Sequence, residues 1–156
     1  MILPTEFIAE PDVVLLDLPA RPGEEAIRAL HRRLAAESDA VTDAPRFLDE
    51  LLERMRIAPV CIAEDIALPH ARTDAVRRLV LGVARAPEGI AFDAAHPRVQ
   101  LVFLIGTPKS AVTEYLRVVA ALTRLLRPPA ARAALMAAAD EAEFRALLSG
   151  GVAAQR

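Results

Sequence analysis

The stretch RVQLVFLIGTP, residues 98–108, decides the fold because it is apolar on both faces of an extended chain. From Val99 to Ile105 the only polar residue is Gln100, so the strict alternation of a half-exposed strand is absent. Strands of this composition are typically buried on both faces. The sequence therefore predicts a central strand here, with other layers of the molecule on both sides of it.

Further strand signals precede this stretch. RRLVLGVARAP, residues 77–87, is a second strong candidate, and EGIAFDAAHP, residues 88–97, separates the two with turn signals at either end. VVLLDL, residues 13–18, is a short strand or an extended lead-in. IAPVCIAEDIALPH, residues 57–70, is short, apolar and punctuated, which favours two small strands or a strand and an irregular loop.

Two helices are predicted before these strands. RPGEEAIRALHRRLAAE, residues 21–37, carries Pro22 and two glutamates in its first turn, a typical helix start. TDAPRFLDELLERM, residues 42–55, is the clearer helix, because Thr42 or Asp43 can cap it and its apolar residues form one stripe.

The last third of the chain is predicted to be helical. Ser110 can cap a first helix, which Pro128-Pro129 stops, and a second helix follows. A third begins at Asp140 and is closed by Gly150-Gly151. The core face predicted for the first of these helices consists of Val112, Leu116, Val119, Thr123 and Leu126.

Taken together, these elements predict a layered α/β fold. Helices, then strands alternating with turns, then helices again indicate a mixed central sheet with helices on both faces. No internal repeat or linker-like segment divides the sequence. We therefore expect one domain over residues 1–156, with its core at about residues 10–148.

The composition limits the classes of function. The chain has 156 residues, of which 54% are hydrophobic, so it is long enough for one domain with a sizeable core. Nineteen basic and 21 acidic side chains give a net charge of -2, which provides no electrostatic reason to expect a nucleic-acid partner. No apolar run approaches the ~20 residues of a membrane span and no signal peptide opens the chain, so we expect a cytoplasmic protein without membrane insertion.

We also expect no metal ion and no other cofactor. Cys61 is the only cysteine, which excludes an internal disulfide and a cysteine-type zinc site, and its apolar surroundings favour a small core residue. The three histidines are scattered, and His96, before Pro97, has no evident metal-ligand companion. There is no hydrolase-type triad pattern and no Gly-rich phosphate loop.

The clearest candidate for chemistry is His70, in IALPHAR, residues 66–72. Pro69 pushes Leu68 toward an extended conformation, so the strand should persist to the proline and then turn, which makes His70 the first residue outside the sheet. A neutral imidazole there can attack a phosphoryl group if cations cover the phosphoryl oxygens. Arg72 is close in sequence and Arg54 could be brought in by folding. A structural histidine without chemistry is the alternative that these residues leave open.

The surrounding sequence resembles a known family. DIALPHAR, residues 65–72, resembles the active-site signature of the fructose/mannitol-type (type 2) EIIA domains of the bacterial phosphotransferase system, including their nitrogen-regulatory branch. GEEAIRALHRRL and RFLDELLERM resemble the first two helices of the family. EGIAFDAAHPRVQLVFLIGTPKSAVTEYLRVVAAL is similar to its strand, turn, central strand and following helix. The likeness covers roughly residues 10–148 and implies the EIIA mannitol/fructose-type fold.

The resemblance also implies roles for individual residues. His70 would accept a phosphoryl group from the histidine-phosphorylated carrier HPr or its nitrogen-branch relative, with Arg54 near the phosphorylation site. Tyr115 stands where many members have a second histidine, and its hydroxyl can donate a hydrogen bond to a phosphoryl oxygen or to His70. The next partner would be an EIIB domain in a sugar transporter, or a regulated target protein in the nitrogen branch.

Some positions depart from the family's pattern. Ala71 replaces the customary glycine, and APVCIAED, residues 58–65, stands where the family has small hydroxyl-bearing residues. Glu64 and Asp65 would oppose a phosphate if they pointed into the site. We expect a regulatory, nitrogen-branch role because the sequence holds no transporter or EIIB segment. The alternatives are a binding module that has lost phosphotransfer and a free-standing sugar-specific EIIA component.

Overall fold

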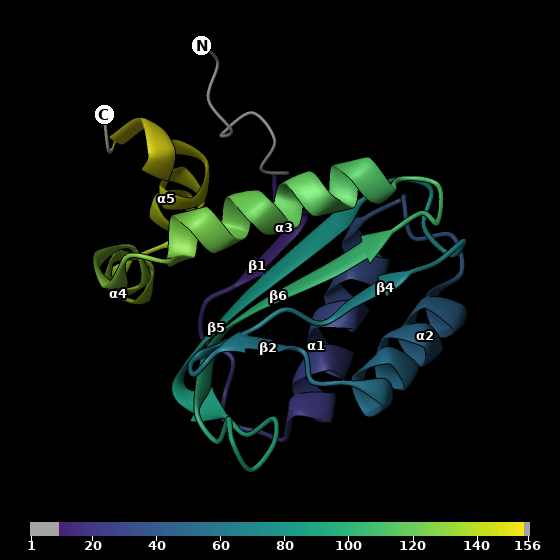
Figure 1. The fold of residues 1–156 in the computed structure, drawn as a ribbon, viewed down its shortest axis with the longest axis horizontal. Coiled ribbons are helices and arrows are strands. Elements are labelled where there is room, and N and C mark those ends of the chain that lie inside the picture. Colours follow the sequence, from purple (N-terminus) through teal and green to yellow (C-terminus); the bar gives the residue numbers. More distant parts are fainter. Residues whose placement is uncertain (1–9, 155–156) are drawn as a thin grey trace. The chain divides into compact units, whose positions relative to one another are not determined.

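The computed structural model describes residues 10–154, which group into two compact units (Figure 1). One unit is Pro11–Ala111, which holds the sheet and the first two helices. The other comprises Glu10 and residues 112–154, which hold the remaining helices. The two units are described separately, and the expectation of a single domain stays a prediction.

The first unit contains a mixed sheet of six strands. Strands β1, β5, β6, β3 and β2 are neighbours in that order, and β4 pairs with β6 beyond the end of β3. β5 and β6 are antiparallel, whereas β1 runs parallel to β5, and β3 and β4 run parallel to β6. The strands are β1 (Val13–Leu15), β2 (Cys61–Ala63), β3 (Ile66–Ala67), β4 (His70–Arg72), β5 (Val80–Ile90) and β6 (Val99–Thr107). The predicted α/β class with a mixed sheet is confirmed.

Helices α1 (Gly23–Glu37) and α2 (Ala44–Ile57) lie together on one face of this sheet (Figure 1). The predicted cap of α2 is present, because the Asp43 side chain accepts a hydrogen bond from the Arg46 amide at 3.2 Å. The apolar stripes of both helices join the inward side chains of β5 and β6 in one core. Members of this core include Ile27, Leu30, Leu34, Phe47, Leu51, Val80, Ala84, Val102 and Leu104.

The opposite face of the central strands is buried as well. The side chains of this face are at most 1% exposed. Gln100, which points to the other face near the start of β6, is half-buried. The prediction of a central strand buried on both faces is therefore confirmed, with β6 extending two residues beyond the apolar run. The buried residues of this face are Leu81, Val83, Leu101, Phe103 and Ile105.

The second unit contains helices α3 (Val112–Leu126), α4 (Pro129–Ala137) and α5 (Glu141–Ala154). As predicted, the Asp140 side chain accepts a hydrogen bond from the amide of Glu143 at the start of α5, at 2.8 Å. The predicted end at Gly150-Gly151 is wrong, because α5 continues to Ala154; glycine costs only about 1 kcal/mol per helical position and does not forbid a helix.

The core face predicted for α3 is also wrong in part. Val112 and Leu116 are 39% and 57% exposed, whereas the buried side chains are Val118, Ala121, Leu122, Leu125 and Leu126. This helix is apolar on more than one side, so its periodicity did not single out one stripe. Within residues 10–154, no helix is both long enough and apolar enough to cross a membrane.

Candidate functional site

His70 lies in a surface hollow of about 300 Å³ between α2 and β4. One wall is β4, with His70, Ala71 and Arg72. The other wall comes from one face of α2, whose lining residues are Glu50, Glu53, Arg54 and Ile57. The structure thus brings together three of the residues predicted for the site, His70, Arg54 and Arg72.

The backbone at His70 differs from the prediction, because His70 is not outside the sheet. It is the first residue of β4, which pairs with β6 in the register that β3 began: Ile66 lies opposite Leu101, and His70 lies opposite Ile105. Pro69 has no amide hydrogen and cannot donate a hydrogen bond to β6, so the pairing with β6 is interrupted at this residue. The Pro69 carbonyl still accepts a hydrogen bond from the Ile105 amide at 2.9 Å. The proline interrupts the strand without turning it.

Because the strand continues through β4, the direction of the His70 and Arg72 side chains follows from the strand geometry. Successive side chains of a strand point to opposite faces. Ala71 is buried in the core beneath α1 and α2, so His70 and Arg72 share the opposite side of β4. Arg72 is exposed, and its Nη2 donates to the Lys109 carbonyl at 3.3 Å. An imidazole and a guanidinium are thereby held two residues apart on one side of the strand.

The His70 ring is oriented by its own backbone. Its Nδ1 lies 3.1 Å from the Leu68 carbonyl oxygen. A carbonyl oxygen can only accept, so Nδ1 carries the proton of the neutral ring and Nε2 is its unprotonated nitrogen. Burial lowers the pKa of His70, the bond to Leu68 opposes this, and the Arg54 guanidinium lowers it further. The lowered pKa favours the neutral form of the ring at neutral pH, in which Nε2 carries no proton.

Arg54 is held at the C-terminal end of α2. Its Nη1 donates to the Ala58 carbonyl, just beyond the helix, at 3.2 Å. This bond satisfies a carbonyl at the helix end and keeps the guanidinium beside the hollow. Since Arg54 is close enough to His70 to lower its pKa, its charge also acts on any anion that the imidazole would contact.

The two carboxylates in the hollow were missed by the sequence reasoning. The acidic residues considered there, Glu64 and Asp65, form the turn between β2 and β3 and do not line the hollow. Glu50 and Glu53 do line it, together with Arg54 and Ile57. The signal was present, since these four positions follow the i, i+3, i+4, i+7 spacing of one helix face.

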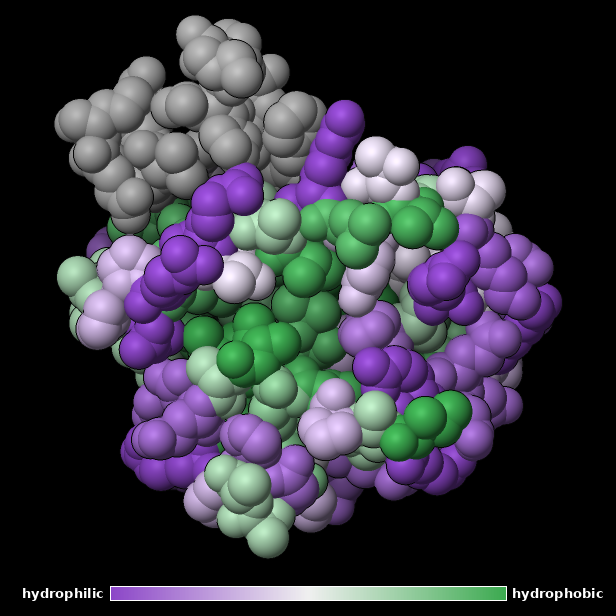
Figure 2. Space-filling view, in the orientation of Figure 1, coloured by the Kyte–Doolittle hydropathy of each residue, from purple (hydrophilic) through white to green (hydrophobic). Residues whose placement is uncertain are grey.

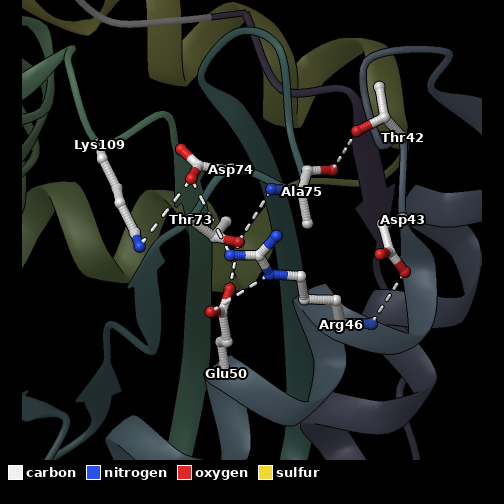
Figure 3. A network of polar contacts seen from close by, with 8 residues as sticks. All are labelled: Thr42, Asp43, Arg46, Glu50, Thr73, Asp74, Ala75 and Lys109. Carbon is white, nitrogen blue, oxygen red and sulfur yellow. Dashed lines mark hydrogen bonds and ion pairs between the residues drawn. The ribbon is translucent and has the colours of Figure 1, made fainter.

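Glu50 does not present an unpaired charge to the hollow. Thr73 Oγ1 donates to Glu50 Oε1, and the Arg46 Nε lies 3.5 Å from Glu50 Oε2 (Figure 3). Thr73 is fully buried, and its Oγ1 in turn accepts from the Ala75 amide at 3.0 Å. Glu53 is paired with Arg56 at 3.2 Å. These contacts offset the two negative charges that would otherwise oppose an anion beside His70.

The same polar contacts fix α2 to the segment that follows β4. Figure 3 shows Arg46 reaching from α2 between Glu50 and Asp74, with Lys109 on the far side of Asp74. Arg46 Nη2 and Lys109 Nζ each lie 3.9 Å from Asp74 Oδ2. Single exposed pairs are worth little, but the buried Thr73 hydroxyl makes this connection specific.

The rim of the hollow also includes an exposed apolar side chain. Figure 2 shows a mostly hydrophilic surface over α2, with a green spot near the C-terminal end of the helix. Ile57, the last residue of α2 and a lining residue, is 71% exposed. An exposed aliphatic group at the rim of a hollow is suited to contact with a protein surface.

Tyr115 is the remaining residue predicted for the site. It lies in the first turn of α3, in the second compact unit, and its side chain is half-buried. Its predicted hydrogen bond to a phosphoryl group or to His70 stays a prediction.

The side chains of Cys61, Asp93 and His96 lie close together, which the sequence analysis did not predict. His96 was expected to have no metal-ligand companion, but its Nδ1 lies 2.8 Å from Asp93 Oδ1, and Cys61 lies beside them. Residues 61 and 96 are far apart in the sequence and become neighbours through the sheet, so their spacing gave no signal. Burial and then the Asp93 charge raise the pKa of the Cys61 thiol to about 11.

The chain is similar to known proteins of the phosphotransferase system. Residues 7–150 match the model of the family described as phosphoenolpyruvate-dependent sugar phosphotransferase system, EIIA 2. The fructose-specific EIIA component of Haloferax volcanii is 33% identical over 139 residues, which cover 88% of this chain and 90% of that protein.

Solved structures agree in fold. A crystal structure of the nitrogen regulatory protein IIA-Ntr from Neisseria meningitidis has a TM-score of 0.79 at 21% identity, covering 92% of this chain and 97% of that one. The mannitol IIA in a complex with phosphorylated IIB, both from Escherichia coli, has a TM-score of 0.77 at 24% identity, covering 89% and 95%. The fold predicted from the resemblance is thereby confirmed.

Proposed function

This chain belongs to the EIIA 2 family of the phosphoenolpyruvate-dependent sugar phosphotransferase system, and from that premise we propose that it carries a phosphoryl group on His70. The observation that supports this most is the hydrogen bond between His70 Nδ1 and the Leu68 carbonyl, which makes Nε2 the unprotonated ring nitrogen of a residue that lines the hollow. The donor is a histidine-phosphorylated carrier of the HPr type.

The transfer needs no cofactor. Nε2 of His70 forms a bond to phosphorus as the bond between phosphorus and the donor's histidine nitrogen breaks, so one phosphoramidate replaces another. The ring gains positive character during attack, and the Leu68 carbonyl, already accepting from Nδ1, stabilises it. Such a step depends mainly on positioning and on electrostatic stabilisation of the phosphoryl oxygens.

Arg54 and Arg72 supply that stabilisation from opposite walls of the hollow. Guanidinium groups match phosphoryl oxygens in geometry and stay charged at all relevant pH values. The pairing of Glu50 with Thr73 and Arg46, and of Glu53 with Arg56, lets the two arginines dominate the potential at His70.

We further propose that phosphorylation of His70 regulates which proteins bind this surface, as the 26% identity over 126 residues to a nitrogen regulatory protein of Bradyrhizobium diazoefficiens suggests. The exposed Ile57 at the rim gives a partner an apolar contact close to the phosphorylated ring. The second candidate is a sugar-specific component that passes the group to an EIIB domain. It is favoured by the 33% identity to a fructose-specific EIIA component.

Phosphoryl uptake tests the first part of the proposal. The protein is incubated with phosphoenolpyruvate, Enzyme I and HPr from its own organism, and its intact mass is measured. We expect one acid-labile phosphoryl group, absent in His70→Ala and retained in His96→Gln, which removes an imidazole outside the hollow. Label that persists in His70→Ala would overturn the site, and no label on the unaltered protein would leave a binding module as the function.

Transfer onward separates the two roles. The phosphorylated protein is mixed with EIIB domains of the same organism, and the phosphoryl group is followed by mass. Rapid transfer to an EIIB domain would identify a sugar-specific component. Retention of the group, with partner binding that differs between the phosphorylated and unphosphorylated forms, is the result expected for a regulatory protein.

A further inference from the structure

A second cluster of reactive side chains lies apart from the His70 hollow. Cys61 is the first residue of β2, while Asp93 and His96 lie in the connection between β5 and β6. The thiol sulfur, a carboxylate oxygen and a ring nitrogen all lie within 4.8 Å of one another. None of the three residues lines the hollow that contains His70. From this geometry we propose that Cys61, Asp93 and His96 form a binding site for a divalent transition-metal ion, with Zn²⁺ as the ion that fits best.

The separations are close to those of a tetrahedral site. With Zn–S at about 2.3 Å and Zn–N or Zn–O at about 2.0–2.2 Å, tetrahedral ligand atoms lie roughly 3.3–3.6 Å apart. The longest separation here is at most 4.8 Å, so it would have to shorten by about 1.3 Å. A change of that size is within reach of side-chain rotation alone, because Asp93 is exposed and His96 and Cys61 are half-buried.

The turn that carries two of the ligands is already ordered by backbone contacts. The Phe92 amide donates to the His96 carbonyl and the His96 amide donates to the Asp93 carbonyl, both at 3.0 Å. The Asp93 side chain also accepts from the Ala95 amide at 2.9 Å. The third ligand, Cys61, is held by its pairing with Ala67 in the sheet. Because the backbone of these ligands is ordered without the metal, only their side chains need to rotate, which lowers the entropic cost of binding it.

Electrostatics favour a cation at this place. Asp93 Oδ1 accepts from His96 Nδ1 at 2.8 Å, an interaction that metal bonds would replace. The Asp93 carboxylate is also one of the groups that keep the Cys61 thiol protonated, after burial. A divalent ion between the two removes that repulsion, and thiolate and carboxylate together would balance its charge.

The mixture of ligand atoms selects the kind of ion. Thiolate and imidazole favour Zn²⁺ and neighbouring transition metals, whereas Mg²⁺ and Ca²⁺ require oxygen ligands throughout. Three protein ligands leave a coordination position for water or for a group of another molecule. The site is thus built to bind an ion at an accessible edge of the sheet, independently of what happens at His70.

Metal binding is tested by equilibrium dialysis of the tag-free protein against Zn²⁺, with bound metal measured by atomic spectroscopy. We expect one ion per chain, and a loss of affinity of at least about tenfold in Cys61→Ser and in His96→Gln. The matched control is Glu64→Gln, which removes a carboxylate from the adjacent hairpin and should leave binding unchanged. His70→Ala should also bind one ion.

A second measurement keeps the proposal testable if a variant is unstable. Co²⁺ replaces Zn²⁺ in the unaltered protein, and a thiolate-to-cobalt charge-transfer band is expected in the near ultraviolet, because Cys61 is the only cysteine. Absence of the band, or Zn²⁺ binding that Cys61→Ser and His96→Gln do not weaken, would overturn the site. Binding that is lost in His70→Ala instead would assign the ion to the other hollow and would also contradict the proposal.

Discussion

Replacement of Gly106 by alanine tests how α2 is positioned against the sheet. Gly106 lies in β6 opposite Ala71 of β4. A Cβ atom at Gly106 would lie 2.5 Å from Cζ and 2.7 Å from Cε1 of Phe47, and 3.1 Å from Cγ2 of Val80. Phe47 belongs to α2 and is fully buried, so its ring has no free volume to enter. The new methyl group therefore pushes on the helix that carries Arg54.

Two effects of opposite sign decide how Gly106→Ala changes the free energy of unfolding. The φ angle of Gly106 is not positive, so alanine fits the backbone and would by itself stabilise the fold by about 0.4–1 kcal/mol. To reach an ordinary contact of about 3.5 Å, the Phe47 ring must retreat by about 1 Å in a packed core, and overpacking of this kind costs about 1–3 kcal/mol. The cost of overpacking is the larger effect, so we expect Gly106→Ala to lower the free energy of unfolding by roughly 1–2 kcal/mol.

Urea denaturation measures this loss as a lower midpoint with an unchanged slope. The matched variant is Phe47→Leu, whose shorter side chain lacks the Cζ atom that is in the way. If the clash is with this ring, the double variant is more stable than the sum of the two single changes by about 1 kcal/mol or more. Additive effects, or a Gly106→Ala protein as stable as the parent, would refute the reasoning.

Three other predictions concern the His70 hollow. Thr73→Val removes the buried hydroxyl that donates to Glu50 and should cost about 1–3 kcal/mol in urea denaturation, while Thr73→Ser should cost less. His70 should titrate in NMR below the ~6.5 of an unperturbed histidine, because burial and Arg54 lower its pKa; a higher value would contradict the site geometry. Arg54→Gln should slow phosphorylation of His70 at least about tenfold, whereas Arg28→Gln, a change at an exposed position of α1 outside the hollow, should not.

Much of the fold could be predicted because its signals are local. The apolar run from Val99 to Ile105 predicted a strand buried on both faces, and Asp43 before Pro45 predicted the start of α2. Where a local signal was ambiguous, the prediction failed. The helix α3 is apolar on more than one side, and only its packing selects the stripe around Val118 and Leu122.

The site was predictable in part for the same reason. His70 and Arg72 stand out because they follow a proline in an apolar strand, and Arg54 came from the resemblance to a family and from its place on α2. The hydrogen bond between Thr73 and Glu50 depends on how α2 packs against the strands, and the spacing of residues in the sequence does not predict that packing. The neighbourhood of Cys61 and His96 is likewise a product of strand order.

The most direct measurement is the NMR spectrum of the His70 ring after incubation with phosphorylated HPr. A neutral imidazole whose Nδ1 hydrogen is held by a backbone carbonyl can form its new bond at one atom alone. The account predicts a phosphoryl group on Nε2 of His70, with Nδ1 still protonated. A phosphoryl group on Nδ1, or a ring that stays unmodified while another residue takes up the label, would contradict it.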